Sequence, residues 1–278
     1  MTEKEMLDIT VETTKEVAKE VYSDVGKPVA KPTGELLGLI PRAIKAALAP
    51  LEKWILQREY NVAETKKLLE EKLQAVPLDL IETPEPHIAI PAMQYISYCM
   101  DNEELRNMYA NLLANSMNKV VKNGVHPGFV EIIKQLSPDE AKILKHMNIT
   151  QNNLPTISLR YEKKDGGGIY IMKNFSNIGE LSGCENPYEV NKYFDNMVRL
   201  GLLENAGCLA SLTNKTLYEP LKNHTQIVSR ATEQNAKAMG YDKYTFEESF
   251  VCLTDFGKSF CSICLGTPKI SILKAEPQ

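Results

Sequence analysis

The chain has 278 residues, of which 24% are charged and 43% are hydrophobic, values typical of an ordinary soluble protein rather than of a disordered one. This length can bury a core and favours two domains over one. The 32 Lys and Arg residues against 36 Asp and Glu residues give a net charge of -4, which argues against bulk binding of nucleic acid.

The amino terminus, MTEKEMLDIT, is too polar and acidic for a secretory signal, and no long uncharged apolar window follows it. We therefore expect a cytoplasmic protein whose six cysteines are reduced thiols. Cys261 and Cys264 form a C-x-x-C, but a zinc site would need two more ligands, and no second pair or close histidine pair follows. We expect both thiols to pack as small apolar groups, with no bound metal.

Residues 1–33 read as a polar, weakly amphipathic helical arm, and residues 34–76 as an amphipathic helical segment. Within the second segment, apolar side chains recur at helical spacing and form one stripe. The stripe consists of Leu36, Ile40, Ile44, Ala47, Leu48, Leu51, Trp54 and Ile55, and it is edged by Arg42, Lys45, Lys53 and Arg58. Such a helix can bury its stripe in its own core, in a partner or in a membrane surface.

We expect a charged helix from Val62 to Leu73 and then a helical body over residues 77–135. Four prolines predict an extended connector over 77–91, followed by a short helix at 92–100. Asp101 and Glu104 form a capping box for a long helix over about 102–122.

Four asparagines repeat at helical spacing on that long helix: Asn107, Asn111, Asn115 and Asn118. One interpretation is a solvated helix face. The other is a polar seam that fixes the register against another helix, including one from a second subunit.

Residues 136–278 have the element order of a winged helix, so the predicted fold is mainly α with an α+β carboxy-terminal domain. Ser137-Pro138-Asp139-Glu140 is a helix start, and Asp165 to Gly168 is a hairpin turn between two strands. Further on we expect a helix over 187–200, a helical insertion at about 213–240, a strand over 244–254 and a closing helix over 255–265.

The chemistry of the sequence points away from DNA binding and catalysis. The exposed charges expected on the helix at 187–200 are Glu189, Lys192, Asp195 and Arg199, and they cancel, whereas phosphate contact requires net positive charge. The four histidines lie far apart, and no phosphate loop or nucleophile elbow occurs. We expect no catalytic residue, no cofactor and a protein-binding or purely structural winged helix.

The runs ELRNMYANLLANSMN (104–118) and HPGFVEIIKQLSPDEAKIL (126–144) resemble the Abi-alpha family of bacterial abortive-infection proteins, which prophages often carry. The upstream LGLIPRAIKAALAPLEKWI and HIAIPAMQYISYCMDNEELR are similar to the same family. The resemblance covers roughly 15–145 closely and the later part more loosely. It implies anti-phage defence and offers no catalytic residues to carry over.

This resemblance leads to a hypothesis about mechanism. Residues 36–58 would leave their resting packing and enter the inner face of the cell membrane, the asparagine seam would assemble a homo-oligomer, and the winged helix would receive a phage protein as the trigger. The opposing interpretation is that 36–58 is core of a helical domain. Two rivals are a prophage regulator that binds operator DNA and a toxin that degrades nucleic acid or nucleotides.

Overall fold

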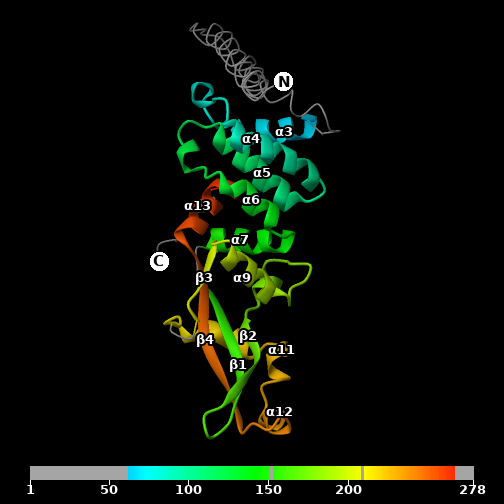
Figure 1. Cartoon of the computed structure of the whole chain (residues 1–278), viewed down its shortest axis with the longest axis vertical. Coiled ribbons are helices and arrows are strands. Elements are labelled where there is room, and N and C mark those ends of the chain that lie inside the picture. The colour runs from blue at the N-terminus through cyan, green and yellow to red at the C-terminus, as the bar shows by residue number, and fades with distance from the viewer. Residues whose placement is uncertain (1–61, 151–152, 208–209, 267–278) are drawn as a thin grey trace, which may run out of the picture. The chain divides into compact units, whose positions relative to one another are not determined.

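The computed structural model describes residues 62–150, 153–207 and 210–266, and the chain separates into two compact units (Figure 1). The described part of unit 1 comprises residues 62–135 and 263–266, and that of unit 2 comprises the described residues of 136–262. The chain is mainly helical, and its strands form one antiparallel sheet in unit 2. The predicted arm, 1–33, and most of the predicted segment 34–76 lie outside the described residues.

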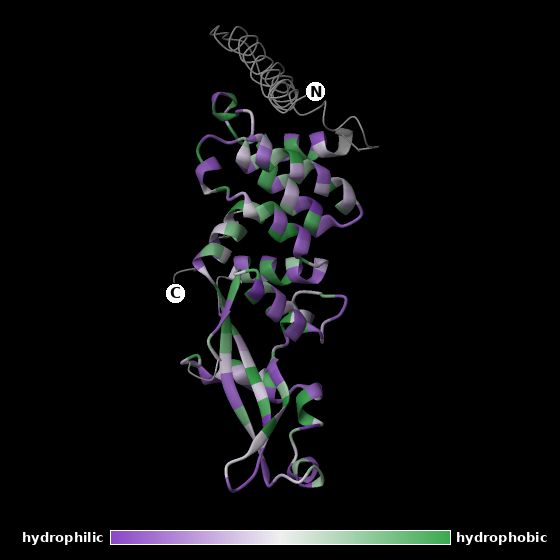
Figure 2. Cartoon of the chain, viewed as in Figure 1, coloured by the Kyte–Doolittle hydropathy of each residue, from purple (hydrophilic) through white to green (hydrophobic). Residues whose placement is uncertain are grey.

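Unit 1 is a helical body centred on α5 (Glu103–Ser116). Helices α3 (Val62–Leu73), α4 (Pro86–Ile96) and α6 (Gly128–Gln135) pack against α5. The fully buried side chains of α5 recur every three to four residues, so they share one side of the helix. Hydrophobic residues gather where these helices meet (Figure 2). They include Met108, Tyr109, Leu112 and Leu113, with Leu69, Ile96, Phe129 and Ile133 from the other three helices.

Three short 3₁₀ turns connect these helices: η1 (Leu78–Leu80), η2 (Ser97–Cys99) and η3 (Lys122–Gly124). The predicted end of α3 at Leu73 is confirmed, and its described residues begin at Val62. The predicted connector was too long, because α4 begins at Pro86 and continues through Pro91. Proline fits the first turn of a helix, and the burial of Ile88, Ala89, Ala92 and Met93 holds the helix together beyond Pro91.

Helix α5 also differs from its prediction at both ends. Its N-cap is Asn102 rather than Asp101, since Oδ1 of Asn102 accepts a hydrogen bond from the backbone N–H of Leu105 at 2.9 Å. The helix ends at Ser116 instead of near residue 122. Backbone hydrogen bonds from Glu82 to Met117 and from Lys119 to Leu80 engage the chain after Ser116, so the backbone leaves the helix there.

Unit 2 begins with α7 (Pro138–Thr150), and its predicted capping box is confirmed. The backbone N–H of Ser137 donates to Oε2 of Glu140 at 2.6 Å, and the N–H of Glu140 donates to Oγ of Ser137 at 3.2 Å. Strands β1 (Leu154–Glu162) and β2 (Gly168–Phe175) then form the predicted hairpin. Its turn contains Gly166 with φ +101°, a backbone conformation that glycine adopts without strain.

The second half of unit 2 contains α8 (Ile178–Leu181), α9 (Val190–Arg199), β3 (Leu203–Asn205), β4 (Lys243–Leu253) and α13 (Asp255–Cys264). The sheet order is β2-β1-β4-β3, and each neighbouring pair is antiparallel. The first residues of α13 belong to unit 2, and its residues from Ile263 onward belong to unit 1. The winged-helix assignment remains a prediction.

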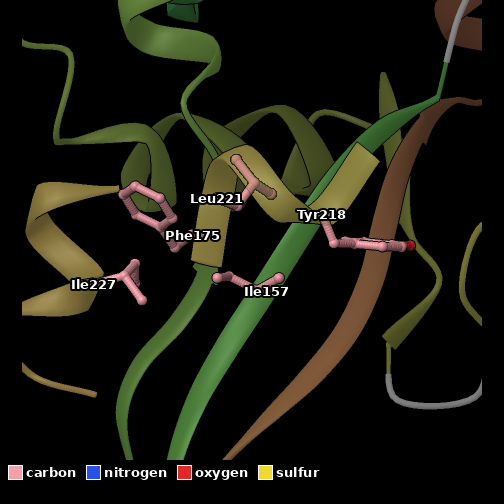
Figure 3. Close-up of a cluster of buried hydrophobic side chains, with 5 residues drawn as sticks. All are labelled: Ile157, Phe175, Tyr218, Leu221 and Ile227. Atoms are coloured by element: carbon pink, nitrogen blue, oxygen red, sulfur yellow. The ribbon is translucent and has the colours of Figure 1, made fainter. Parts of the chain in front are cut away.

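The predicted helical insertion lies between β3 and β4. It contains η5 (Lys215–Tyr218), α10 (Glu219–Lys222), α11 (Thr225–Val228) and α12 (Glu233–Ala238). These short helices cover one face of the sheet, where Tyr218, Leu221 and Ile227 meet Ile157 of β1 and Phe175 of β2 (Figure 3). Hydropathy alternates along β1 because successive side chains point to opposite faces (Figure 2).

Candidate interaction surfaces

The amphipathic stripe predicted to contact a membrane or a partner lies outside the described residues. Its apolar and cationic members are Leu36, Ile40, Ile44, Leu48, Leu51, Trp54 and Ile55, with Arg42 and Lys45. Their role therefore stays a prediction from the sequence.

Of the four asparagines, Asn118 lies beyond the end of α5, and two of the three on the helix bond to the last turn of α13. Nδ2 of Asn111 donates to the carbonyl oxygen of Cys264 at 2.8 Å, and Nδ2 of Asn115 donates to that of Ile263 at 2.7 Å. The last carbonyls of a helix have no partner within the helix, so these amides supply the missing donors. A polar contact that fixes one helix against another is therefore present within the chain.

The other two asparagines have different surroundings. Oδ1 of Asn118 accepts from the backbone N–H of Val120 at 3.0 Å and stabilises the turn after α5. Asn107 is half-buried, as are the other three. A purely solvated face is thus wrong for Asn111 and Asn115, while a seam between subunits remains a prediction for the row.

The C-x-x-C of α13 is buried. Cys261 and Cys264 have no exposed surface, and burial raises the pKa of the Cys261 thiol to about 12. Both cysteines are buried, as expected for small apolar groups. Within the described ranges, no three His, Cys, Asp or Glu side chains come close enough together to hold a metal ion.

The first turn of α7 carries a buried carboxylate that the sequence had assigned only to a helix start. The carboxylate of Asp139 accepts hydrogen bonds from the backbone N–H groups of Glu185 (2.8 Å) and Asn186 (3.0 Å) and from the hydroxyl of Tyr193 (2.9 Å). Burial by itself would raise the pKa of Asp139. These donors and the ammonium of Lys142 outweigh burial, so the pKa is lowered. Asp139 thereby fixes the loop before α9 onto α7.

Glu140 ties α9 to α7 in the same way. Its Oε1 accepts from Nδ2 of Asn196 at 2.8 Å while Oε2 serves the capping box. Both oxygens are thus occupied, which suits a structural carboxylate better than a general base. The contact between Ser137 and Glu140 was predictable because it is local, but nothing in the spacing of residues indicated that Asn196 on α9 bonds to Glu140.

The outer surface of α9 carries the charges that the sequence predicted. Glu189, Lys192, Asp195 and Arg199 are all exposed. Lys192 is paired with Glu189, and Nη2 of Arg199 donates to Oδ1 of Asn196 at 2.6 Å. With the N-cap Glu189 included, these four charges cancel.

The sheet face opposite the insertion carries a network of charged side chains that the sequence analysis missed. Nη1 of Arg160 lies 3.4 Å from Oε1 of Glu247, and the hydroxyl of Tyr170 donates to Oε2 of the same carboxylate at 2.8 Å. Lys243 pairs with Glu162 at 3.3 Å. The alternation of charged and apolar residues in β1 was a signal for this face, but the partners depend on the register with β4.

Comparison with known proteins gives one family. The model of the abortive infection alpha family matches residues 57–264, which is most of the chain and includes both described units. The chain belongs to the abortive infection alpha family. Membership implies a role in abortive infection, the defence in which an infected bacterium stops the spread of a phage.

The match to the abortive infection alpha family covers a different range from the resemblance seen in the sequence, which was close over roughly 15–145 and looser after it. It begins at residue 57, after the amphipathic stripe, and continues to residue 264 at the end of α13. The two-unit body is therefore the part that matches the family, and the stripe precedes it.

The other comparisons add little. None of the curated proteins matches the chain. A solved structure of an uncharacterized protein from the hydrocarbon-degrading marine bacterium Alcanivorax borkumensis SK2 is 16% identical, over 49% of this chain and 90% of that chain, with a TM-score of 0.33. A TM-score this low supports no inference about fold or function. In the described part of the chain, no helix combines the length and hydropathy needed to cross a membrane.

Proposed function

We propose that this protein is a non-enzymatic effector of abortive infection. It senses a phage component, assembles into a homo-oligomer and disrupts the host membrane through residues 36–58. Family membership supports the abortive-infection role. The observation that carries the membrane step is the apolar stripe from Leu36 to Ile55 with its flanking cations.

A stripe of this kind suits a membrane surface. The apolar side chains enter the boundary of the hydrocarbon, while cations such as Arg42 and Lys45 are drawn to anionic headgroups. One such helix is too polar to span a bilayer alone. In a ring of several such helices, Arg42 and Lys45 face a water-filled lumen and the apolar faces of the helices contact lipid. Both kinds of side chain are then in a favourable solvent.

The described side chains favour a non-enzymatic effector. The buried carboxylates of Asp139 and Glu140 have hydrogen-bond donors on both oxygens. Burial raises the pKa of the Cys184 thiol and the Cys252 thiol to about 11, and it raises that of Cys261 further. Thiols that stay protonated at neutral pH are poor nucleophiles.

Unit 2 is proposed to receive the trigger, which is a protein. The balanced charge of α9 and its N-cap Glu189 supports a protein partner over DNA, because a surface without net charge gains little from phosphates. The four asparagines of the predicted seam are proposed to contribute to assembly. Asn107 and Asn118 do so directly, and Asn111 and Asn115 do so through the α13 end to which they bond.

The membrane step is tested by following the membrane potential with a voltage-sensitive dye in cells challenged with a phage against which the protein protects. We expect depolarisation before lysis, with nucleic acid and nucleotide pools intact at its onset. Growth arrest with a normal potential overturns the proposal. Early loss of nucleic acid or nucleotides supports the toxin rival, and a sequence-specific gel shift by the full chain supports the regulator.

A further inference from the structure

Strand β2 forms the long open edge of the sheet in unit 2. The sheet order is β2-β1-β4-β3, so β1 is the described strand that pairs with β2. The opposite edge strand, β3, is limited to Leu203–Asn205. An edge strand presents backbone groups on its outer side that another extended chain can pair with.

The first part of β2 carries neither charge nor proline, two of the usual protections of an edge, although its pairing with β1 shifts register between Leu159 and Arg160. Gly168 to Met172 reads GIYIM, without a charge or a proline. Ile169 and Tyr170 are 37% and 38% exposed, respectively. Protected edges are usually short or carry charge and proline, so this strand is suited to accept a partner strand.

The charges around the edge indicate the chemistry of the partner. Residues 163–175 carry Lys163, Lys164 and Lys173 against Asp165, and all four side chains are exposed. Asp242 lies beside the turn, where it accepts from the backbone N–H of Lys164, and it reduces the positive charge without cancelling it. The edge is thus locally positive in a chain of net charge -4.

We infer that β2 is the docking edge for an extended acidic segment of the phage protein, which adds to the four-stranded sheet as one more strand. This inference rests on the proposed function and specifies how its trigger is recognised. Backbone pairing provides the attachment, and carboxylates of the incoming strand face Lys173 and the lysines of the turn. A second copy of this chain would instead bring the same lysines toward each other.

The test uses the full-length protein and synthetic peptides that tile the virion proteins of a phage against which it protects. Binding is measured by fluorescence anisotropy and mapped by hydrogen exchange. We expect peptides with alternating apolar and acidic residues to bind and to slow exchange across 168–175. Methylating alternate backbone nitrogens of a binding peptide should abolish binding when the methyl groups face β2 and preserve it when they face away.

Charge reversal at the edge provides the matched variants. Lys173→Glu should weaken binding about fivefold to tenfold, with a smaller loss at high salt, because an attraction becomes a repulsion. Lys237→Glu on α12 makes the same change in net charge at another exposed lysine and should leave affinity within about twofold. Equal effects of the two variants would overturn the inference.

Three other outcomes also overturn it. They are absence of binding by any acidic peptide, protection that maps away from β2, and protection of β2 that appears with protein concentration alone. The proposed function is judged separately by depolarisation. Depolarisation on infection without peptide binding at β2 would contradict only this inference. Peptide binding that maps to β2 without depolarisation would contradict only the membrane step.

Discussion

Asn115 and Ile263 are joined by a hydrogen bond of 2.7 Å although 148 residues separate them in the sequence. The bond connects the last turn of α5, the central helix of unit 1, to the last turn of α13. Asn111 makes the equivalent bond to Cys264 one helical turn earlier. Ile263 and Cys264 belong to unit 1 together with α5, so the two amides satisfy the last carbonyls of α13 within that unit.

Replacing both amides should loosen the end of α13. We expect Asn111→Ala with Asn115→Ala to lower the free energy of unfolding by about 2 kcal/mol, because two carbonyls lose their donors. The buried Cys264 should then react faster with an alkylating reagent, as followed by mass spectrometry of its peptide. Asn107→Ala is the control and should leave the Cys264 rate unchanged. Equal rates of Cys264 alkylation in the wild type and the double variant would show that the two amides do not stabilise the end of α13.

Asp139 should make unit 2 sensitive to acid. Its pKa is lower in the folded chain than in the unfolded chain, so its stabilising contribution is present above the unfolded value of about 4 and is lost as pH falls through the folded value. Asp139→Asn should cost about 2 kcal/mol at pH 7 and flatten the acid dependence below pH 4. Urea unfolding across a pH series measures both effects. The exposed Asp195→Asn serves as the control, and a steep acid response surviving in Asp139→Asn would contradict the assignment.

Gly257 should tolerate no side chain. A Cβ at this position would lie 2.0 Å from the carbonyl oxygen of Leu202, so the start of α13 and the segment before β3 would have to separate. Gly257→Ala should cost about 3 kcal/mol or more, whereas Gly167→Ala, which meets nothing within 4 Å, should change stability by less than about 0.5 kcal/mol. Thermal unfolding of the two variants decides the point, and similar stabilities would refute the close approach.

The stripe of residues 36–58 should tolerate no charge on its apolar face. Leu48→Glu and Trp54→Glu should each abolish toxicity and depolarisation on phage challenge, because a carboxylate at that position opposes entry into lipid. The protein should remain present and folded in cell extracts, as judged by immunoblot and limited proteolysis. Gln57→Glu adds the same charge off the stripe and should retain activity. Full toxicity in both stripe variants would exclude the membrane step.

Several elements were predictable because the interactions that form them are local. Ser137 and Glu140 exchange hydrogen bonds three residues apart, and Gly166 supplies the turn of its own hairpin. Local rules failed where a neighbour competes or packing intervenes. Asn102 rather than Asp101 caps α5, and burial against α5 carries α4 through Pro91.

The amino-acid sequence alone determined the family, the helix start at Ser137 and the hairpin of β1 and β2, since these depend on residue identity and short spacing. Only the tertiary structure decided that Asn111 and Asn115 hold α13, that Asp139 holds the loop before α9, and that β2 lies at an open edge. Each of these contacts joins segments far apart in the chain. The spacing of residues within one segment carries no information about which distant backbone groups need a partner.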